Sequence, residues 1–289
     1  MARLSFNRID MKKASKMKYL KPLVLSVCLL VITQVSTVCA STMYIGDGIF
    51  FYEFDRATNR ATTLSPHDTQ AIAFSPDGTM YMGDGINFYE FDRTTNRATT
   101  LSPHNTQAIA FSPDGTMYMG DGVNFYEFDR ATNRATTLSP HDTQAIAFSP
   151  DGTMYMGDGI NFYEFDQATN RATTLSPHDT QAIAFSPDGK MYIGDGINLY
   201  EFDRATNRAT TLSPHDTQAI AFSPDGKMYI GDGINLYEFD RATNRATTLS
   251  LHDTQAIAFS PVPVPPAIWF FVAGVLSLFS LATRKTLTY

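Results

Sequence analysis

A unit of 37 residues recurs almost unchanged along most of this chain. Its first copy opens at Met43, and its sixth copy stops at Ser260. The other copies begin at Met80, Met117, Met154, Met191 and Met228. A fixed period of this size predicts that each copy forms one structural unit and that neighbouring units stack to bury a common core. We therefore expect one repeat domain over residues 43–260, with a separate segment at each end.

Each copy predicts four short β-strands separated by tight turns. In one period we expect strands at Gln70–Ser75, Thr79–Met82, Asn87–Phe91 and Arg97–Leu101. The turns contain Pro-Asp-Gly, Gly-Asp-Gly and Asn, which favour tight or left-handed conformations. No stretch of the repeats has the period and caps of a helix. The strands become more polar from the first to the fourth, which is typical of the inner and outer strands of a β-propeller blade.

The aromatic residues of the third strand have side chains on both faces of the expected sheet. Phe88 lies on one face, and Tyr89 and Phe91 lie on the other. Such side chains fit a blade that is packed on both sides by its neighbours. A repeated platform for sugars is the alternative, although the repeats contain no Trp.

The number of strands predicts how the repeats close. The first copy begins with the second strand of a blade, whereas residues 255–260 supply an additional first strand at the end. If this last strand completes the first blade, the chain forms six four-stranded blades with no strand left over. We therefore predict an all-β, six-bladed propeller, because a linear β-solenoid would not need this offset.

The charge of the repeats excludes some partners. The repeats carry 28 of the 29 acidic residues but only 13 Lys and Arg, a net charge of -15. Such a surface repels nucleic acid and anionic lipid. It suits solubility or association with divalent cations.

The first 40 residues resemble a secretory signal peptide. A basic opening precedes the apolar run at residues 23–32, and small or tolerated residues precede a cut after Ala40. Export by signal peptidase would remove Cys28 and Cys39, the two cysteines of the chain. A retained membrane anchor and a lipoprotein signal at Cys39 are the alternatives, and translation could begin at Met1, Met11 or Met17.

All six histidines occupy one position of the repeat, just before the first strand of a blade: His67, His104, His141, His178, His215 and His252. A ring of histidines beside aspartates such as Asp68 could bind a metal or respond to pH. The arrangement also resembles WD-repeat propellers, in which a His in this link hydrogen-bonds an Asp in a turn. That resemblance implies a structural bond to Asp84 and its equivalents. We expect the structural role, no metal and no cofactor.

The motif Ile72–Gly78, followed by Tyr81–Asp84 and Tyr89–Asp92, resembles the blades of NHL and gluconolactonase-like six-bladed propellers. The resemblance covers residues 43–260. It implies the fold, and it raises a hydrolase or lactonase in the channel as one possible function. However, gluconolactonases need unlike metal ligands from different blades, whereas these blades are nearly identical. We find no nucleophile, base and acid set, so we expect no catalytic residues and no enzyme.

The last 29 residues resemble a PEP-CTERM sorting signal. Residues 261–266 form a Pro-rich spacer, residues 267–289 contain an uncharged apolar stretch, and Arg284 and Lys285 form a basic end. Val262, Pro263, Val264 and Pro265 match the Val-Pro-Glu-Pro motif, except that Val264 replaces Glu. The resemblance implies a transmembrane helix in the inner membrane, processing by an exosortase-like enzyme, and a cell that makes exopolysaccharide. A plain tail anchor is the alternative.

These patterns together predict an exported propeller at the cell surface or in the extracellular matrix. We expect a structural, adhesive or multivalent ligand-binding role, with exopolysaccharide or another extracellular ligand as partner and no nucleic acid.

Overall fold

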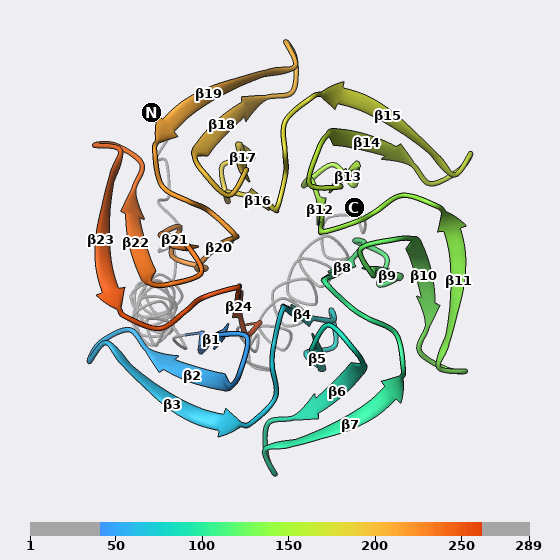
Figure 1. Cartoon of the computed structure of the whole chain (residues 1–289), viewed down its shortest axis with the longest axis horizontal. Helices are drawn as coiled ribbons and strands as arrows, with labels where there is room; N and C mark the ends of the chain where they lie inside the picture. The colour runs from blue at the N-terminus through green and yellow to red at the C-terminus, as the bar shows by residue number, and fades with distance from the viewer. Residues whose placement is uncertain (1–40, 262–289) are drawn as a thin grey trace, which may run out of the picture. The chain divides into compact units, whose positions relative to one another are not determined.

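The computed structural model describes residues 41–261. Over this range the chain forms 24 strands in six antiparallel sheets of four strands each. The sheets stand around a common centre as the blades of a propeller (Figure 1). The predicted six-bladed fold is confirmed. The predicted signal peptide, Pro-rich spacer and transmembrane helix lie outside the described residues, except for Pro261, the first residue of the spacer.

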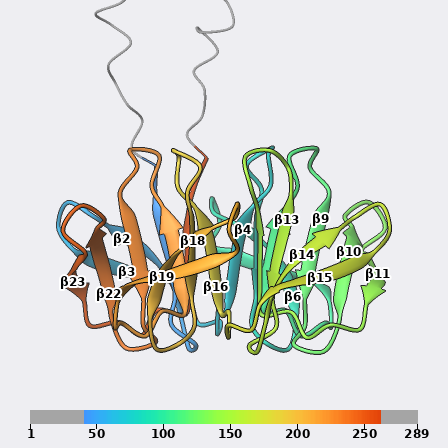
Figure 2. The same ribbon diagram turned by 90° about the horizontal axis from the view of Figure 1, so that it is seen from above.

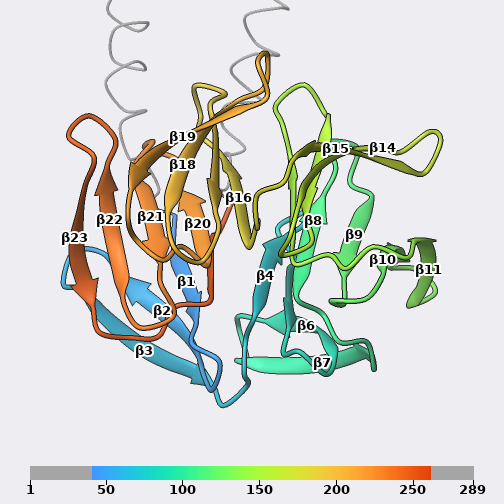
Figure 3. The ribbon, with the colours of Figure 1, turned by 45° about the horizontal axis from the view of Figure 1, so that its top comes forward.

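One blade shows the pattern that the others repeat. It consists of β4 (Ala71–Phe74), β5 (Met80–Gly83), β6 (Phe88–Asp92) and β7 (Arg97–Ser102), in that order from the centre outward. The remaining strands are β1 (Met43–Gly46), β2 (Phe51–Asp55), β3 (Arg60–Ser65), β8 (Ala108–Phe111), β9 (Met117–Gly120), β10 (Phe125–Asp129), β11 (Arg134–Ser139), β12 (Ala145–Phe148), β13 (Met154–Gly157), β14 (Phe162–Asp166), β15 (Arg171–Ser176), β16 (Ala182–Phe185), β17 (Met191–Gly194), β18 (Leu199–Asp203), β19 (Arg208–Ser213), β20 (Ala219–Phe222), β21 (Met228–Gly231), β22 (Leu236–Asp240), β23 (Arg245–Ser250) and β24 (Ala256–Phe259). Figure 3 shows the inner strands β4, β8, β16 and β20 around the centre, with β7, β11 and β23 at the rim.

The strand boundaries differ from the predicted ones by at most one residue. Gln70 and Ser75 lie just outside β4, where their backbone N–H groups bond Gly83 O at 2.8 Å and Thr79 O at 2.9 Å. Gly83 was expected in a turn but belongs to β5, where it pairs with Ala71. The first Gly of each Gly-Asp-Gly motif therefore ends a strand, and the turn begins at the Asp.

The last strand closes the ring as predicted. β24 pairs antiparallel with β1, with Phe259 opposite Met43 and Ile257 opposite Ile45. Beyond the strand, Ser260 N donates to Thr42 O at 2.9 Å. The predicted strand at residues 255–260 is therefore present as Ala256–Phe259, in the sheet of order β24-β1-β2-β3. This pairing covers the inner edge of β1, which would otherwise be unpaired, and gives the first blade the same four strands as the others.

Hydrophobic side chains pack between neighbouring blades. Tyr81 and Phe88 from one blade form a buried cluster with Met117, Met119 and Phe128 from the next. The rings of Phe88 and Phe128 lie 4.9 Å apart, centroid to centroid, in an edge-on arrangement. The prediction that these aromatic residues form the core is confirmed, since Phe88 is fully buried.

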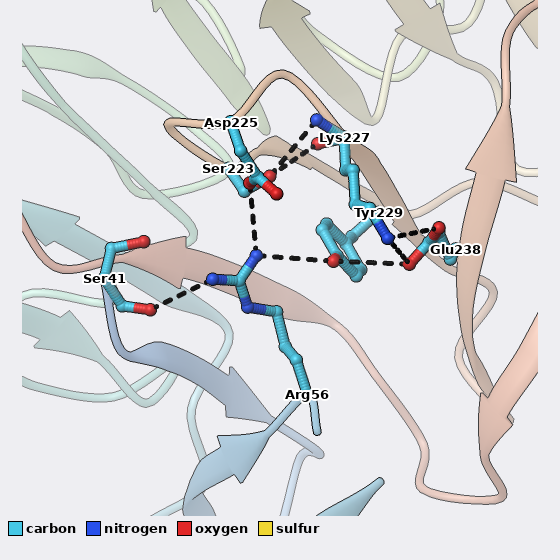
Figure 4. Close-up of polar contacts among 7 residues, drawn as sticks. All are labelled: Ser41, Arg56, Ser223, Asp225, Lys227, Tyr229 and Glu238. Carbon is cyan, nitrogen blue, oxygen red and sulfur yellow. Dashed lines mark hydrogen bonds and ion pairs between the residues drawn. The ribbon is translucent and has the colours of Figure 1, made fainter. Parts of the chain in front are cut away.

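Ion pairs between an Arg of one blade and an Asp of the preceding blade join four of the six seams in the described ring. At the closing seam, Arg56 Nη1 lies 3.3 Å from Asp225 Oδ1 and 3.5 Å from Tyr229 Oη, and Arg56 Nη2 lies 3.5 Å from Ser41 O (Figure 4). Lys227, on the same blade as Asp225, pairs with Glu238. The closing seam therefore has polar contacts in addition to the β24–β1 pairing.

Two seams have no such ion pair because the sequence departs from the repeat there. Arg93 faces the blade that the chain ends complete, where no Asp-Gly follows Pro261, and it bonds Gly78 O at 3.1 Å instead. At the other seam Gln167 replaces the Arg that would face Asp114. Sequence differences between otherwise equal blades thus alter individual seams.

We predict that Gln167→Arg stabilises the protein slightly. The new guanidinium should reach Asp114 as Arg204 reaches Asp151, at 3.1 Å. Because these groups are largely exposed and solvent screens their charges, the rise in the free energy of unfolding should be small. Chemical denaturation measures this gain, and the gain should disappear when Asp114→Asn is also present. An equal gain with and without Asp114 would show that the ion pair is not its cause.

The ring has two faces with different chemistry. One carries the β4–β5 and β6–β7 turns and their equivalents, and the described chain begins and ends there (Figure 2). We refer to it as the chain-end face. All 13 Lys and Arg of the described residues lie in turns or strand starts on this side. The opposite face carries the β5–β6 loops and the links between blades, with their histidines.

Candidate functional site

The loops between the second and third strands of the blades are built around an aspartate. In the second blade, Asp84 Oδ1 accepts hydrogen bonds from the N–H groups of Ile86 at 2.8 Å and Asn87 at 2.5 Å. Tyr89 Oη donates to Asp84 Oδ2 at 2.6 Å, and Gly85 supplies the positive φ of 74°. The loop is held in one shape by its own residues.

The ionisation of this pair follows from its contacts. Burial opposes the charge on Asp84, but the bonds from Tyr89 and the two backbone N–H groups outweigh it and lower the pKa of Asp84. Burial and the bond to Asp84 raise the pKa of Tyr89 to about 12. At neutral pH the pair is therefore a carboxylate with a hydroxyl donor.

This construction leaves one aliphatic side chain exposed at each loop. Ile86 is 71% exposed and Val123 is 66% exposed. We call the segments of sequence Asp-Gly-Ile or Asp-Gly-Val the Asp-Gly-Ile loops, and the surface that they form with the links the Asp-Gly-Ile face. The loops span residues 47–50, 84–87, 121–124, 158–161, 195–198 and 232–235. All large hydrophobic side chains that are exposed in the described residues lie on this face: Ile49, Phe50, Ile86, Val123, Ile160, Ile197, Ile234 and Leu251.

The histidines lie on this face, but their contacts differ from the predicted ones. His67 Nδ1 hydrogen-bonds Ser65 Oγ at 2.5 Å, and the His67 ring packs edge-on against Tyr89 at 5.0 Å between centroids. The bond to Asp84 comes from Tyr89, so the prediction that His67 bonds this Asp is wrong. Because Tyr89 already occupies Asp84 Oδ2, the imidazole supports the tyrosine. The same packing recurs at the other five histidines.

The histidine ring does not gather into a metal centre. Over residues 41–261 no group of three His, Cys, Asp or Glu side chains could hold a metal ion. His67, His104, His141, His178, His215 and His252 each belong to a separate blade link, with a Ser and a Tyr as neighbours.

The residue after each His adds a second set of acidic groups to this face. Asp68 Oδ1 is buried without a hydrogen-bond partner, and its Oδ2 lies 3.5 Å from Gln70 Nε2. Burial raises the pKa of Asp68, and the charges of Asp84, Asp47 and Asp253 act in the same direction. Asp142, Asp179, Asp216 and Asp253 show the same direction, whereas the third blade has Asn105 at this position.

We predict that Asp142→Asn stabilises the protein at neutral pH. Because the folded-state pKa is raised, the favourable contribution of Asp142 is complete below its unfolded pKa and is lost as the pH rises through the folded pKa. At pH 7 an amide should therefore raise the free energy of unfolding by less than about 1 kcal/mol, because solvent screens the charge of this partly buried group, and the gain should vanish below about pH 4. Denaturation at both pH values measures this. Asn105→Asp is the matched control with the opposite sign, and a loss of stability in Asp142→Asn at pH 7 would contradict the account.

The central channel is lined by equivalent residues from all six blades. Toward the Asp-Gly-Ile face, a cavity of about 110 Å³ is surrounded by six Gln-Ala-Ile sets, such as Gln70, Ala71 and Ile72. Toward the chain-end face, a wider space of about 570 Å³ is bordered by Phe and Pro side chains, including Phe74 and Pro150. Neither region brings together unlike catalytic groups. The channel therefore supplies amide and apolar contacts rather than an acid and base pair.

Several predicted sites cannot be placed. The cleavage position Ala40 and the sorting residues Val262, Pro263, Val264, Pro265, Arg284 and Lys285 lie outside the described residues. Within the described ring, no helix has the length and apolar character needed to cross a membrane.

Comparisons with known proteins identify the fold. No protein-family model matches the chain, and no curated protein matches it in sequence. Among solved structures, a chain of a nidogen/laminin complex has a TM-score of 0.68 at 13% identity, covering 77% of this chain and 99% of that one. A protein of unknown function from Bacteroides caccae has a TM-score of 0.60 at 12% identity, covering 76% of this chain and 99% of that one. A gluconolactonase candidate has a TM-score of 0.57 at 9% identity, covering 67% of this chain and 85% of that one. At these identities the likeness establishes the propeller fold alone.

Proposed function

We propose that this protein is an exported, non-enzymatic propeller that binds its ligand through several equivalent blades at the cell surface or in the extracellular matrix. The observation that carries the proposal is the equivalence of the blades. Each blade presents the same Asp-Gly-Ile loop, held by the same Asp–Tyr bond, on one face. Weak binding at each loop would add up to useful avidity when the ligand itself repeats.

Sequence patterns at the two ends support export and surface location. The segment that ends at Ala40 resembles a signal peptide, and residues 261–289 resemble a sorting tail. We propose that signal peptidase and an exosortase-like enzyme process the chain, with the inner membrane as a temporary anchor. The intact mass of the protein recovered from the cell surface tests this, because a retained tail would exclude processing.

A lactonase in the channel is the competing function, and the similarity to a gluconolactonase candidate is its support. Against it, the channel residues repeat from blade to blade, whereas an enzyme of this kind needs one asymmetric set of groups.

One experiment separates the two functions. The protein from the cell surface is assayed for lactone hydrolysis and for binding to arrays of glycans and of peptides. We expect no turnover and binding by several blades per chain. Turnover that a single channel substitution such as Gln144→Ala abolishes would instead establish the enzyme.

A further inference from the structure

The Asp-Gly-Ile face combines exposed aliphatic side chains with a one-sided charge. Its loops and links contain 11 aspartates and no Lys or Arg. The six residues Ile49, Ile86, Val123, Ile160, Ile197 and Ile234 are each 65–71% exposed. All the exposed large hydrophobic side chains of the described residues lie on this face and none on the other, which makes this face the candidate interaction surface.

The charge decides which partner fits. Eleven aspartates repel nucleic acid, anionic lipid and acidic polysaccharide. They also repel the same face of a second copy. A partner that offers apolar side chains to the isoleucines and positive charges to the aspartates would satisfy both features, because complementary charge favours association and fixes its orientation.

The geometry favours a surface that is ready to bind. The carboxylate of each loop is fixed by two backbone N–H groups and a tyrosine, so little loop motion is lost on binding. The face also lies opposite the side where the described chain begins and ends.

We propose that the Asp-Gly-Ile face docks a polypeptide surface that carries basic and apolar side chains, with one contact per blade. This inference rests on the proposed multivalent function and names the chemistry of its partner. The exposed aliphatic side chains supply the apolar contact, and the aspartates select a partner with positive charge.

The test uses the intact protein and a synthetic peptide of alternating Leu and Lys, with binding followed by calorimetry. A peptide of alternating Ser and Lys serves as the control without apolar side chains, and a peptide of alternating Leu and Glu as the control without basic side chains. We expect the Leu and Lys peptide to bind at least about tenfold more tightly than either. If the Ser and Lys peptide binds as tightly as the Leu and Lys peptide, net charge alone explains the binding and the inference is overturned.

Matched variants locate the contact. A variant with Ser at five loops (Ile86→Ser, Val123→Ser, Ile160→Ser, Ile197→Ser and Ile234→Ser) should lose the preference for the Leu and Lys peptide. A control with Ser at five exposed alanines of the chain-end face (Ala57→Ser, Ala131→Ser, Ala168→Ser, Ala205→Ser and Ala242→Ser) should keep it. If the fivefold variant fails to fold, Ile86→Ser with Ile197→Ser should still remove part of the preference. No change in that preference in a folded variant would contradict the assignment.

Other occupants of the face give distinct results. Binding of phosphatidylglycerol vesicles, or self-association in sedimentation that the fivefold variant abolishes, would replace the basic polypeptide by lipid or by a second copy and overturn the inference. Binding of a glycan by several blades, without the Leu and Lys peptide, would overturn it and leave the multivalent function intact. Lactone turnover without binding would overturn both.

Discussion

A chain that ends after Leu251 is expected to lose the cooperative unfolding transition of the ring. This truncation removes β24, the strand that pairs with β1 and completes the first blade. It also removes Phe259, which packs 5.4 Å from Tyr229 of the last blade, and Ile257, which packs on the same cluster. We expect a loss of about 5 kcal/mol or more, comparable with the whole stability of an ordinary domain.

Thermal unfolding followed by circular dichroism measures this effect, and two controls separate closure from simple shortening. A chain that ends after Pro261 retains β24 and should melt as the full chain does. A synthetic peptide of residues 252–261 added to the shorter chain should restore the transition by pairing with β1. A shorter chain that melts like the longer one would show that the last strand does not close the ring.

The second large effect is expected for Gly83→Ala. A Cβ on Gly83 would lie 2.2 Å from Thr106 O and 2.6 Å from Thr106 Cβ, in the buried link to the next blade. Backbone cannot move aside there, so we expect a loss of about 3 kcal/mol or more.

Gly78→Ala is the matched control for this substitution. Gly78 has a φ of 86°, and a Cβ there would meet no atom within 4 Å. The only cost should then be the strained backbone conformation, which should lower the free energy of unfolding by about 1 kcal/mol. Equal losses in chemical denaturation of the two variants would mean that the close approach to Thr106 does not govern the packing.

The repeat and the offset between its ends were enough to predict the fold. Each copy has four strands, and the first blade lacks its first strand until residues 255–260 supply it. Pairing this strand with β1 therefore gives six complete blades. Buried Phe88 was predictable because apolar residues on both faces of a strand require neighbours on both sides. The end of β5 at Gly83 was not predictable, since the absence of a Cβ matters only where Thr106 approaches.

The contacts of the candidate site were harder to predict. The side chain that bonds Asp84 is Tyr89, five residues away, whereas the resemblance to WD-repeat propellers implied a bond from His67. Ile86 was overlooked because an aliphatic residue beside an aromatic strand suggests burial. Asp84 Oδ1 accepts hydrogen bonds from the backbone N–H groups of Ile86 and Asn87, and in this turn the side chain of Ile86 is exposed. A repeated Asp-Gly-Ile segment in a loop is the signal that could have revealed it.

Ion pairs between blades depend on the closed ring. Arg130 reaches Asp77, which is 53 residues earlier in the sequence. This spacing corresponds to no local pattern and arises only when two blades lie side by side. Only in the closed ring is it visible that Gln167, in place of Arg, leaves the seam at Asp114 without an ion pair.

The most direct test of the account is the number of ligand molecules that one chain binds at saturation. The intact protein is titrated with a single-epitope form of the ligand found on the arrays, and the complexes are counted by native mass spectrometry. Six equivalent blades predict up to six bound ligands with similar affinities. A polymer of the same epitope should then bind at least about a hundredfold more tightly. A single bound ligand, lost on one substitution in the channel, would contradict the account.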